Sequence, residues 1–254
     1  MTRRILGLAI MLGACGSSQT TDDPVDSIAA LGTRHAMSGS KAPAQPRFEN
    51  RAAVRYHMAR HFDDLRAVER LLVANKLEDA KTRAFLLTIP SSDPGMAPWE
   101  SQSMHVTAAA VELTKAPTIA TACRTEARLA KACAECHTRV PKPPAFAKLP
   151  SLPADEGTVE SKMLRHQWAV DRLWDGMIGA SDAAWSAALD VLASTPAPWE
   201  SADDVAGHAK HLRQLANDAR DKQGTETLDG RAAAYGEIMI ACAACHATLP
   251  ARQY

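Results

Sequence analysis

Two nearly identical five-residue segments, CAECH at 133–137 and CAACH at 242–246, constrain this chain most. Each has two cysteines three positions apart, followed directly by a histidine. On a helix, residues three apart share a face, so both sulfurs can bond the vinyl groups along one edge of a porphyrin. The histidine then offers an imidazole to the iron. This is the attachment pattern of a c-type haem, and its repetition predicts two haems per chain, held by Cys133, Cys136 and His137 and by Cys242, Cys245 and His246.

Two other uses of paired cysteines fit the sequence less well. A redox dithiol needs no histidine after the second cysteine and normally follows a strand in a βαβ unit, and no such unit is visible here. A structural zinc site needs four ligands at tight local spacing. Neither segment has a second cysteine or histidine pair close by, so haem attachment is the stronger interpretation.

The N-terminus has the features of a bacterial export signal. Arg3 and Arg4 precede a short apolar run that is too short to cross a bilayer as a helix. The ending LGAC resembles a lipobox, in which Cys15 becomes the lipidated first residue of the mature chain. We expect residues 1–14 to be the signal peptide and 15–47, rich in Ser, Thr, Asp and Pro over most of its length, to be a flexible tether.

Export agrees with the haem chemistry, because bacteria attach c-type haem on the far side of the inner membrane. The predicted location is therefore the periplasm, with a lipid anchor in a membrane. Gly16, after the lipobox, resembles the residues that sort lipoproteins to the outer membrane. An ordinary signal peptide, with Cys15 unmodified, is the alternative.

The charge balance excludes one class of partner. The chain has 29 basic and 29 acidic residues, and loss of Arg3 and Arg4 with the signal leaves it weakly acidic. A nucleic-acid binder would be strongly basic, so we expect no nucleic-acid partner. With lipid and haem taking the other five cysteines, Cys123 remains, and a buried, inert thiol is its expected state.

The chain contains an internal repeat. YHMARHFDDLRAVERL at 56–71 is echoed by SKMLRHQWAVDRLWDG at 161–176, and APWES occurs at 97–101 and at 197–201. The haem segments follow in the same order. The repeat predicts two haem-binding domains, 48–141 and 155–254, separated by a proline-rich linker at 142–154.

Each half is predicted to be helical. Residues that favour helices dominate, β-branched and aromatic residues are sparse, and prolines divide each half into four segments. The expected helices are 49–74, 77–89, 99–115 and 118–138, then 156–178, 182–193, 199–221 and 225–248. Along 119–136 the apolar residues and both haem cysteines share one face, interrupted by Glu126. The predicted fold class is all-α: two consecutive four-helix bundles, each with a haem segment on its last helix.

A c-type segment on the last helix of a four-helix bundle resembles the class II cytochromes c, the cytochrome c-prime group and its six-coordinate relatives. The resemblance covers both halves, so the chain looks like a tandem pair. It implies that a first-helix methionine approaches the iron from the distal side, which here corresponds to Met58 and Met163.

The residues alone leave the distal ligand open. His61 lies three after Met58, and His166 three after Met163, so each pair shares a helical face. Either side chain can bind the iron, while core packing of the methionines and a surface or propionate contact of the histidines are the alternatives. A thioether ligand raises the reduction potential, a second imidazole lowers it, and an open position admits a small gas.

These patterns predict a dihaem c-type cytochrome that carries single electrons between redox partner proteins of the cell envelope. A small-gas (NO or CO) binder or sensor with a five-coordinate haem is the alternative. A dihaem peroxidase is less favoured, because the sequence offers no acid–base pair placed to cleave an O–O bond. An electron carrier, rather than an enzyme, is therefore the expectation.

Overall fold

The computed structural model describes residues 51–89, 96, 99–139, 149–194, 203–221 and 223–248. Over these residues the chain is all-helical and has no strand, as the composition predicts. The signal peptide and tether, Cys15 and most of the proline-rich linker lie outside the described residues. None of the described helices is long and apolar enough to cross a membrane.

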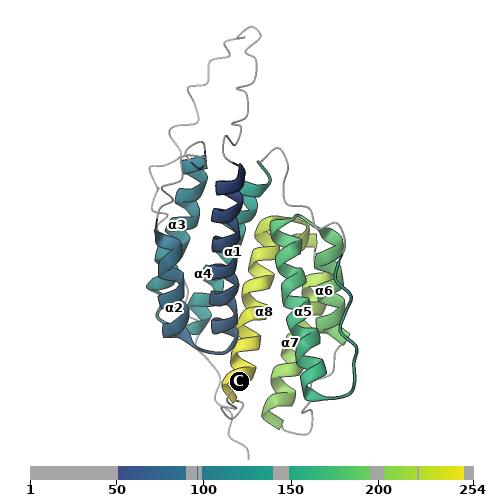
Figure 1. The fold of residues 1–254 in the computed structure, drawn as a ribbon. Coiled ribbons are helices and arrows are strands. Elements are labelled where there is room, and N and C mark those ends of the chain that lie inside the picture. The colour runs from purple at the N-terminus through teal and green to yellow at the C-terminus, as the bar shows by residue number, and fades with distance from the viewer. Residues whose placement is uncertain are drawn as a thin grey trace, which may run out of the picture. The chain divides into compact units, whose positions relative to one another are not determined.

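The first half contains four α-helices that pack in chain order (Figure 1). They are α1 (Arg51–Val73), α2 (Leu77–Phe85), α3 (Glu100–Thr114) and α4 (Ile119–His137), with a 3-10 turn at Leu86–Thr88. α1 also contacts α4. The predicted segments are confirmed to within a few residues, except that 77–89 ends its α-helix at Phe85.

The second half repeats this order. Its helices are α5 (Val159–Ile178), α6 (Asp182–Ser194), α7 (Asp203–Asp221) and α8 (Leu228–Thr248), with a 3-10 turn at Gln223–Glu226 before α8. Neighbours in sequence pack together again, and α5 contacts α8. The predicted start of the third helix, at 199–202, lies outside the described residues.

The turn after the first helix has the same backbone form in both halves. Asn75 and Ala180, each seventeen residues after the first-helix methionine, adopt left-handed φ angles of 57° and 48°. Asparagine tolerates this region well, whereas alanine adopts it at a cost of about 1–2 kcal/mol. Because Ala180 adopts this unfavourable conformation at the position equivalent to Asn75, the shared turn supports the repeat seen in the sequence.

The two halves share packed helices rather than meeting only through a linker. α4 packs along α8, and α8 also contacts α1 and α5, between which it is seen in Figure 1. Arg124 of α4 pairs with Glu237 of α8 at 2.8 Å, and Lys131 pairs with Asp229 at 3.0 Å. As the residue number rises along α4 it falls along α8, so the two helices are antiparallel.

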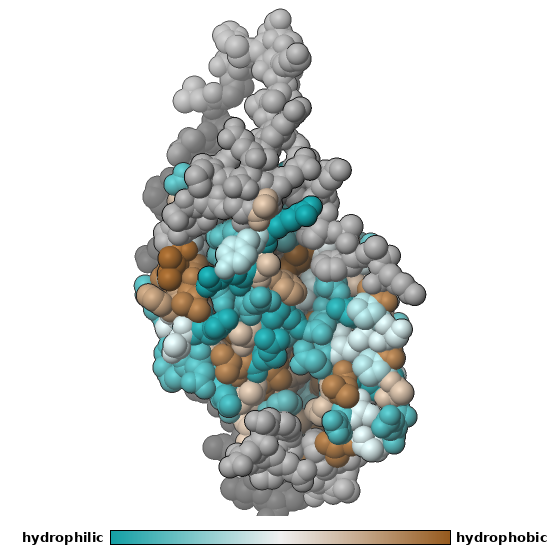
Figure 2. Space-filling model, viewed as in Figure 1, coloured by the Kyte–Doolittle hydropathy of each residue, from teal (hydrophilic) through white to brown (hydrophobic). Residues whose placement is uncertain are grey.

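Small residues allow α4 and α8 to approach closely. A Cβ atom on Gly236 would lie 3.4 Å from both the Ala127 Cβ and the Arg124 Cα. One hydrophobic core extends through both halves, from Leu72 and Leu129 to Leu173 and Ile238. Hydrophilic side chains are interspersed with smaller hydrophobic patches on the face shown in Figure 2, an ordinary arrangement for a surface that covers such a core.

Candidate functional site

The C-terminal part of α4 carries the first haem segment. The helix begins after Thr118, whose side-chain oxygen accepts a hydrogen bond from the Thr121 amide at 3.1 Å. This cap fixes where the helix starts and hence which face its last turns present. Cys133, Cys136 and His137 are all half-buried in those last turns.

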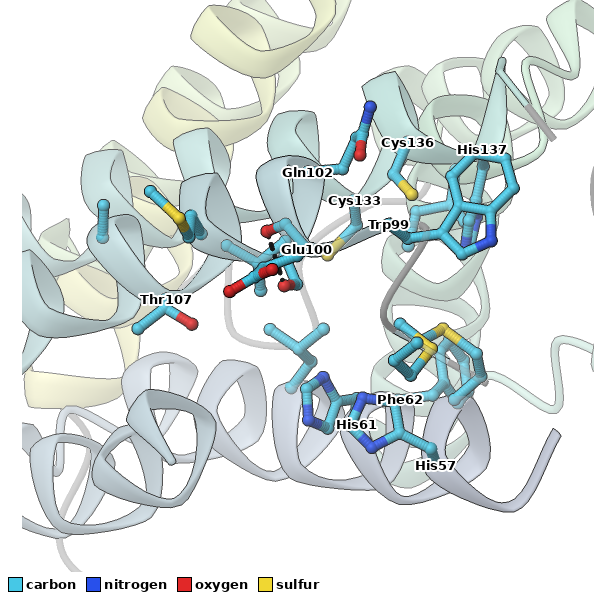
Figure 3. Close-up of a pocket in the computed structure, with 18 of the residues that line it drawn as sticks. His57, His61, Phe62, Trp99, Glu100, Gln102, Thr107, Cys133, Cys136 and His137 are labelled. Atoms are coloured by element: carbon cyan, nitrogen blue, oxygen red, sulfur yellow. Dashed lines mark hydrogen bonds between the residues drawn. The ribbon is translucent and has the colours of Figure 1, made fainter. Parts of the chain in front are cut away.

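These three residues line a cavity of about 630 Å³. Met58 and His61 of α1 line it as well, so the structure brings together every residue predicted for the first site. In Figure 3, the cysteines and His137 project from α4 toward the cavity, and His57 and His61 face it from α1. Other lining residues come from α1 (Phe62 and Leu65), the loop between α2 and α3 (Ile89, Met96 and Trp99), α3 (Val106) and the end of α5 (Ile178).

Met58 lies within a small apolar cluster at this cavity. The cluster has Val54, Met96 and Trp99 at its centre, with Met58 and Cys136 packed against them. Met58 therefore shares packing partners with the second haem cysteine. The thioether of Met58 lies near the attachment segment, as an iron ligand must. The same position also agrees with a role in core packing alone.

His61 is held in its neutral form. Its ring centroid lies 4.0 Å from that of His57. Burial, together with the smaller effects of the His57 and Arg60 charges, lowers the pKa of His61 to about 4. A neutral imidazole keeps a free nitrogen lone pair at neutral pH, which is the form that binds iron.

The cysteine thiols are protonated at neutral pH. Burial raises the pKa of Cys133 to about 12, with smaller contributions from Cys136 and Glu126. Burial likewise raises the pKa of Cys136. A redox-active dithiol depends on a lowered thiol pKa, so these surroundings are the opposite of those that such a site needs.

The second segment, on α8, has a similar environment. Burial raises the pKa of Cys242 to about 12, helped by Cys245 and Glu69, and burial also raises that of Cys245. Burial lowers the pKa of His246, as it does that of His137, where the Ile178 backbone partly offsets the effect.

His166 of α5 lies close to His246 of α8. Burial, together with the smaller effects of the His246 and Arg165 charges, lowers the pKa of His166 to about 4. Within the described part of the chain, the Nε2 atom of His166 is buried and has no hydrogen-bond partner. Such a nitrogen is one that an iron ion would satisfy. Met163, one turn earlier on the same helix, is half-buried.

Three contributors to the first site were not predicted from the sequence. The His57 ring lies against that of His61 at a tilted angle of 47°, but the matching position in the second half is Lys162, so the repeat did not point to it. Trp99 lies in the recurring APWES segment, but the repeat assigns it no role at the haem. Ile178 belongs to the second half, and only the packing of α5 against α4 brings it to the cavity.

The residues present fit a covalently attached haem. Two thiols and an imidazole on α4 face a methionine and an imidazole on α1, across a mainly apolar cavity within the range of about 300–1,000 Å³ that ligand pockets occupy. Among the described residues, no three His, Cys, Asp or Glu side chains gather as ligands for a lone metal ion.

Comparisons of this chain with protein-family models, with curated proteins and with solved structures found no match.

Proposed function

We propose that this chain is a dihaem c-type cytochrome that transfers single electrons in the bacterial cell envelope. The observation that carries the proposal is the cavity of about 630 Å³, where Cys133, Cys136 and His137 of α4 meet Met58 and His61 of α1. Residues from opposite ends of the first half thus form one site whose donors match the needs of a c-type haem.

Each group of the first site has a defined task in this proposal. Cys133 and Cys136 would hold the haem covalently, and His137 would offer its imidazole to the iron. Met58 or His61 would supply a second ligand. Apolar side chains such as Phe62 and Leu65 exclude water from the cavity. The haem supplies the one-electron change between ferric and ferrous iron, and the protein tunes it through ligand and burial.

The second site uses the equivalent residues. Cys242 and Cys245 would hold the second haem covalently, and His246 would offer its imidazole to the iron. His166, whose buried Nε2 atom lacks a partner among the described residues, is the stronger distal candidate, with Met163 as the alternative. The two sites then differ in ligand chemistry, and hence in potential, if Met58 closes the first iron.

The proposed architecture is a pair of four-helix bundles, α1–α4 and α5–α8, joined along α4 and α8. Packing of consecutive helices and the contacts α1–α4 and α5–α8 support it. The proposed location is the periplasm, with a lipid on Cys15 as the membrane anchor and envelope redox proteins as partners. The signal-like N-terminus supports that part.

Haem stoichiometry tests the proposal directly. A pyridine haemochrome assay should give two haems per chain, and acid–acetone should extract neither because both are covalent. Cys136→Ser should weaken the attachment of the first haem only, and Cys245→Ser should weaken that of the second haem only. One haem per chain, or haem that extracts freely, would contradict the dihaem proposal.

Ligand substitution separates electron transfer from gas binding. In the first half, Met58→Leu and His61→Leu form a matched pair, because the two positions share a helical face. The variant that removes the true ligand should become high-spin and bind carbon monoxide, while the other should keep the wild-type spectrum. Met163→Leu and His166→Leu test the second half in the same way. If both wild-type haems bind carbon monoxide at once, the gas-binding alternative replaces electron transfer.

A further inference from the structure

A buried polar cluster lies where the two halves meet, and the proposed electron transfer does not use it. It consists of Glu69 of α1, Glu126 of α4, Trp174 of α5 and Tyr235 of α8. Their side chains are fully buried, with 1% of Glu69 and 0% of Glu126 exposed. Carboxyl groups are rarely buried to this extent, because losing water destabilises their charged form.

The hydrogen bonds in this cluster end at Glu69. The Trp174 Nε1–H group donates to the Tyr235 hydroxyl at 2.8 Å, and that hydroxyl donates to Oε2 of Glu69 at 2.8 Å. Arg66 donates to the same carboxylate oxygen and also pairs with Asp171 of α5. Glu69 therefore accepts hydrogen bonds from two groups, Tyr235 and Arg66, and Trp174 supports it through Tyr235.

Glu126 has weaker support, because Arg66 and Tyr235 lower its pKa by less than burial and the charge of Glu69 raise it. Neither of its carboxyl oxygens has a hydrogen-bond partner among the residues that the structure describes. The Tyr235 hydroxyl has a single proton, and Glu69 receives it. A buried carboxylate without a donor is costly, and a bound proton removes that cost.

The positive charge near Glu126 comes from Arg66, which also acts on the buried Asp175 of α5, while Arg70 of α1 acts on Glu69. Because Arg66 is divided among several acids, it does not neutralise Glu126. On α1 it faces Glu69 and Arg66, and Arg66 is shared with Asp171 of α5. On α8 it faces Tyr235. On α3, the charged residue that reaches α4 is Glu112, which pairs with Arg128 at the exposed surface.

The surroundings raise the pKa of both acids. Burial, and then the charge of Glu69, raises the pKa of Glu126 well above its usual value. Burial also raises the pKa of Glu69, against the opposing effect of Arg66. Two acids that face each other in an apolar setting cannot both ionise at low cost, so they share a proton.

The cluster lies between the two haem segments. Glu126 precedes Cys133 by seven residues on α4, and Tyr235 precedes Cys242 by seven on α8. Seven residues are two helical turns, about 10.5 Å along the axis. The charge of Glu126 contributes to the raised pKa of Cys133, and that of Glu69 to the raised pKa of Cys242, which agrees with this placement.

We propose that Glu69 and Glu126 form a proton-binding site, which holds one shared proton and exchanges it with solvent as the charge of the two attachment sites changes. The link to redox charge rests on the dihaem function proposed above; the shared proton does not. When one electron from a donor protein lowers the charge at an attachment site by one unit, the affinity of the pair for its single proton rises, and molecules that had released this proton take it up again from solvent. The proton converts the Glu126 carboxylate to a carboxylic acid, so its charge partly offsets that of the added electron.

Coulomb's law sets the size of this linkage. A unit charge about 10.5 Å away in a medium of effective dielectric constant near 20 changes proton affinity by about tenfold. The haem potentials should therefore fall with rising pH over roughly one pH unit, and be flat outside that range.

Infrared spectroscopy of the intact holoprotein tests the shared proton. The wild-type protein should show the carbonyl band of a protonated carboxyl group in a dry environment, with the downshift in D2O that identifies an acid. Glu126→Gln should remove this band. Glu112→Gln, which changes an exposed acid on α3, is the matched control and should keep it. If Glu126→Gln does not fold, Glu126→Leu replaces it as the test variant. It places no polar atom in the cluster and should likewise remove the band.

A pH series of redox titrations tests the linkage. The wild-type protein and Glu112→Gln should show pH-dependent potentials, and Glu126→Gln should show flat ones. Absence of the acid band in the wild-type protein would overturn the proton site. Flat wild-type potentials, with two haems and the acid band present, would overturn the linkage. A chain without haem would overturn the proposed function instead, and the infrared result would still decide the proton site.

Discussion

Replacing Gly176 by alanine should destabilise the protein, because α5 and α6 touch at this glycine. A Cβ atom on Gly176 would lie 2.8 Å from the Trp185 Cβ, 3.0 Å from its Cα and 3.1 Å from its backbone nitrogen. Two of these three atoms belong to the backbone, so no change of side-chain rotamer relieves the overlap. The start of α6 must move away from α5.

Two opposing terms set the magnitude. Overpacking of this kind costs about 1–3 kcal/mol, while alanine in place of glycine inside a helix gains about 1 kcal/mol. The movement also strains the hydrogen bond at 2.7 Å from Arg231 Nη1 to the Gly176 carbonyl, worth about 1 kcal/mol. The net loss in free energy of unfolding is about 1–3 kcal/mol.

Equilibrium unfolding in urea, followed by circular dichroism, measures the effect. Gly207→Ala is the matched control, because Gly207 lies inside α7, is exposed, and would place its Cβ within 4 Å of nothing. That variant should gain about 1 kcal/mol. The haem spectrum of Gly176→Ala should also shift at the first site, since Ile178 lines the cavity two residues later. If Gly176→Ala is as stable as Gly207→Ala, the close approach of α5 and α6 is refuted.

Three further predictions concern pH, the buried cluster and the N-terminus. The pKa values of His61 and His166 fall from 6.5 to about 4 on folding, so between these pH values the unfolded chain binds more protons and stability must fall as pH drops. The free energy of unfolding in urea should differ between pH 7 and pH 5 by roughly 1–2 kcal/mol per histidine. Equal stabilities would contradict the burial of both rings. Tyr235→Phe removes one of the two donors to the buried Glu69 carboxylate and the acceptor of the Trp174 indole, and should lower the free energy of unfolding by about 1–3 kcal/mol. Tyr56→Phe, at a residue that is 67% exposed, should have no effect in the same assay. Cys15→Ala should release the protein from membranes or block its maturation, and mass spectra showing an unmodified Cys15 in the wild-type protein would rule out lipidation.

The helices and the first site follow from the sequence because local rules determine them. Prolines and helix-forming residues set the segments, and the spacing of Met58 and His61 puts both on one face. A haem cavity requires that face to oppose α4, and the structure places both residues in one cavity with Cys133. The distal ligand itself stays a prediction, since packing also accounts for Met58.

The contact between the halves could not be predicted in the same way. It depends on small residues such as Ala127 and Gly236, whose presence on a helix has no single meaning. Glu126 stood out only as an interruption of an apolar face. Its neighbours Glu69 and Tyr235 are far away in sequence, and no local pattern connects them.

The antiparallel packing of α4 on α8 has a consequence for how a duplicated chain can diverge. Glu126 and Tyr235 occupy the same position in the two repeats, as do Glu69 and Trp174, and Arg66 and Asp171. In a symmetric dimer of single-repeat chains, a residue at the two-fold axis meets its own copy, so an acid would face an acid. Joining the repeats in one gene frees each position to mutate separately. The first repeat could then keep the two acids while the second acquired the Tyr235 hydroxyl, the Trp174 indole and the Asp171 carboxylate. The interface is therefore asymmetric in a way that two identical chains cannot be.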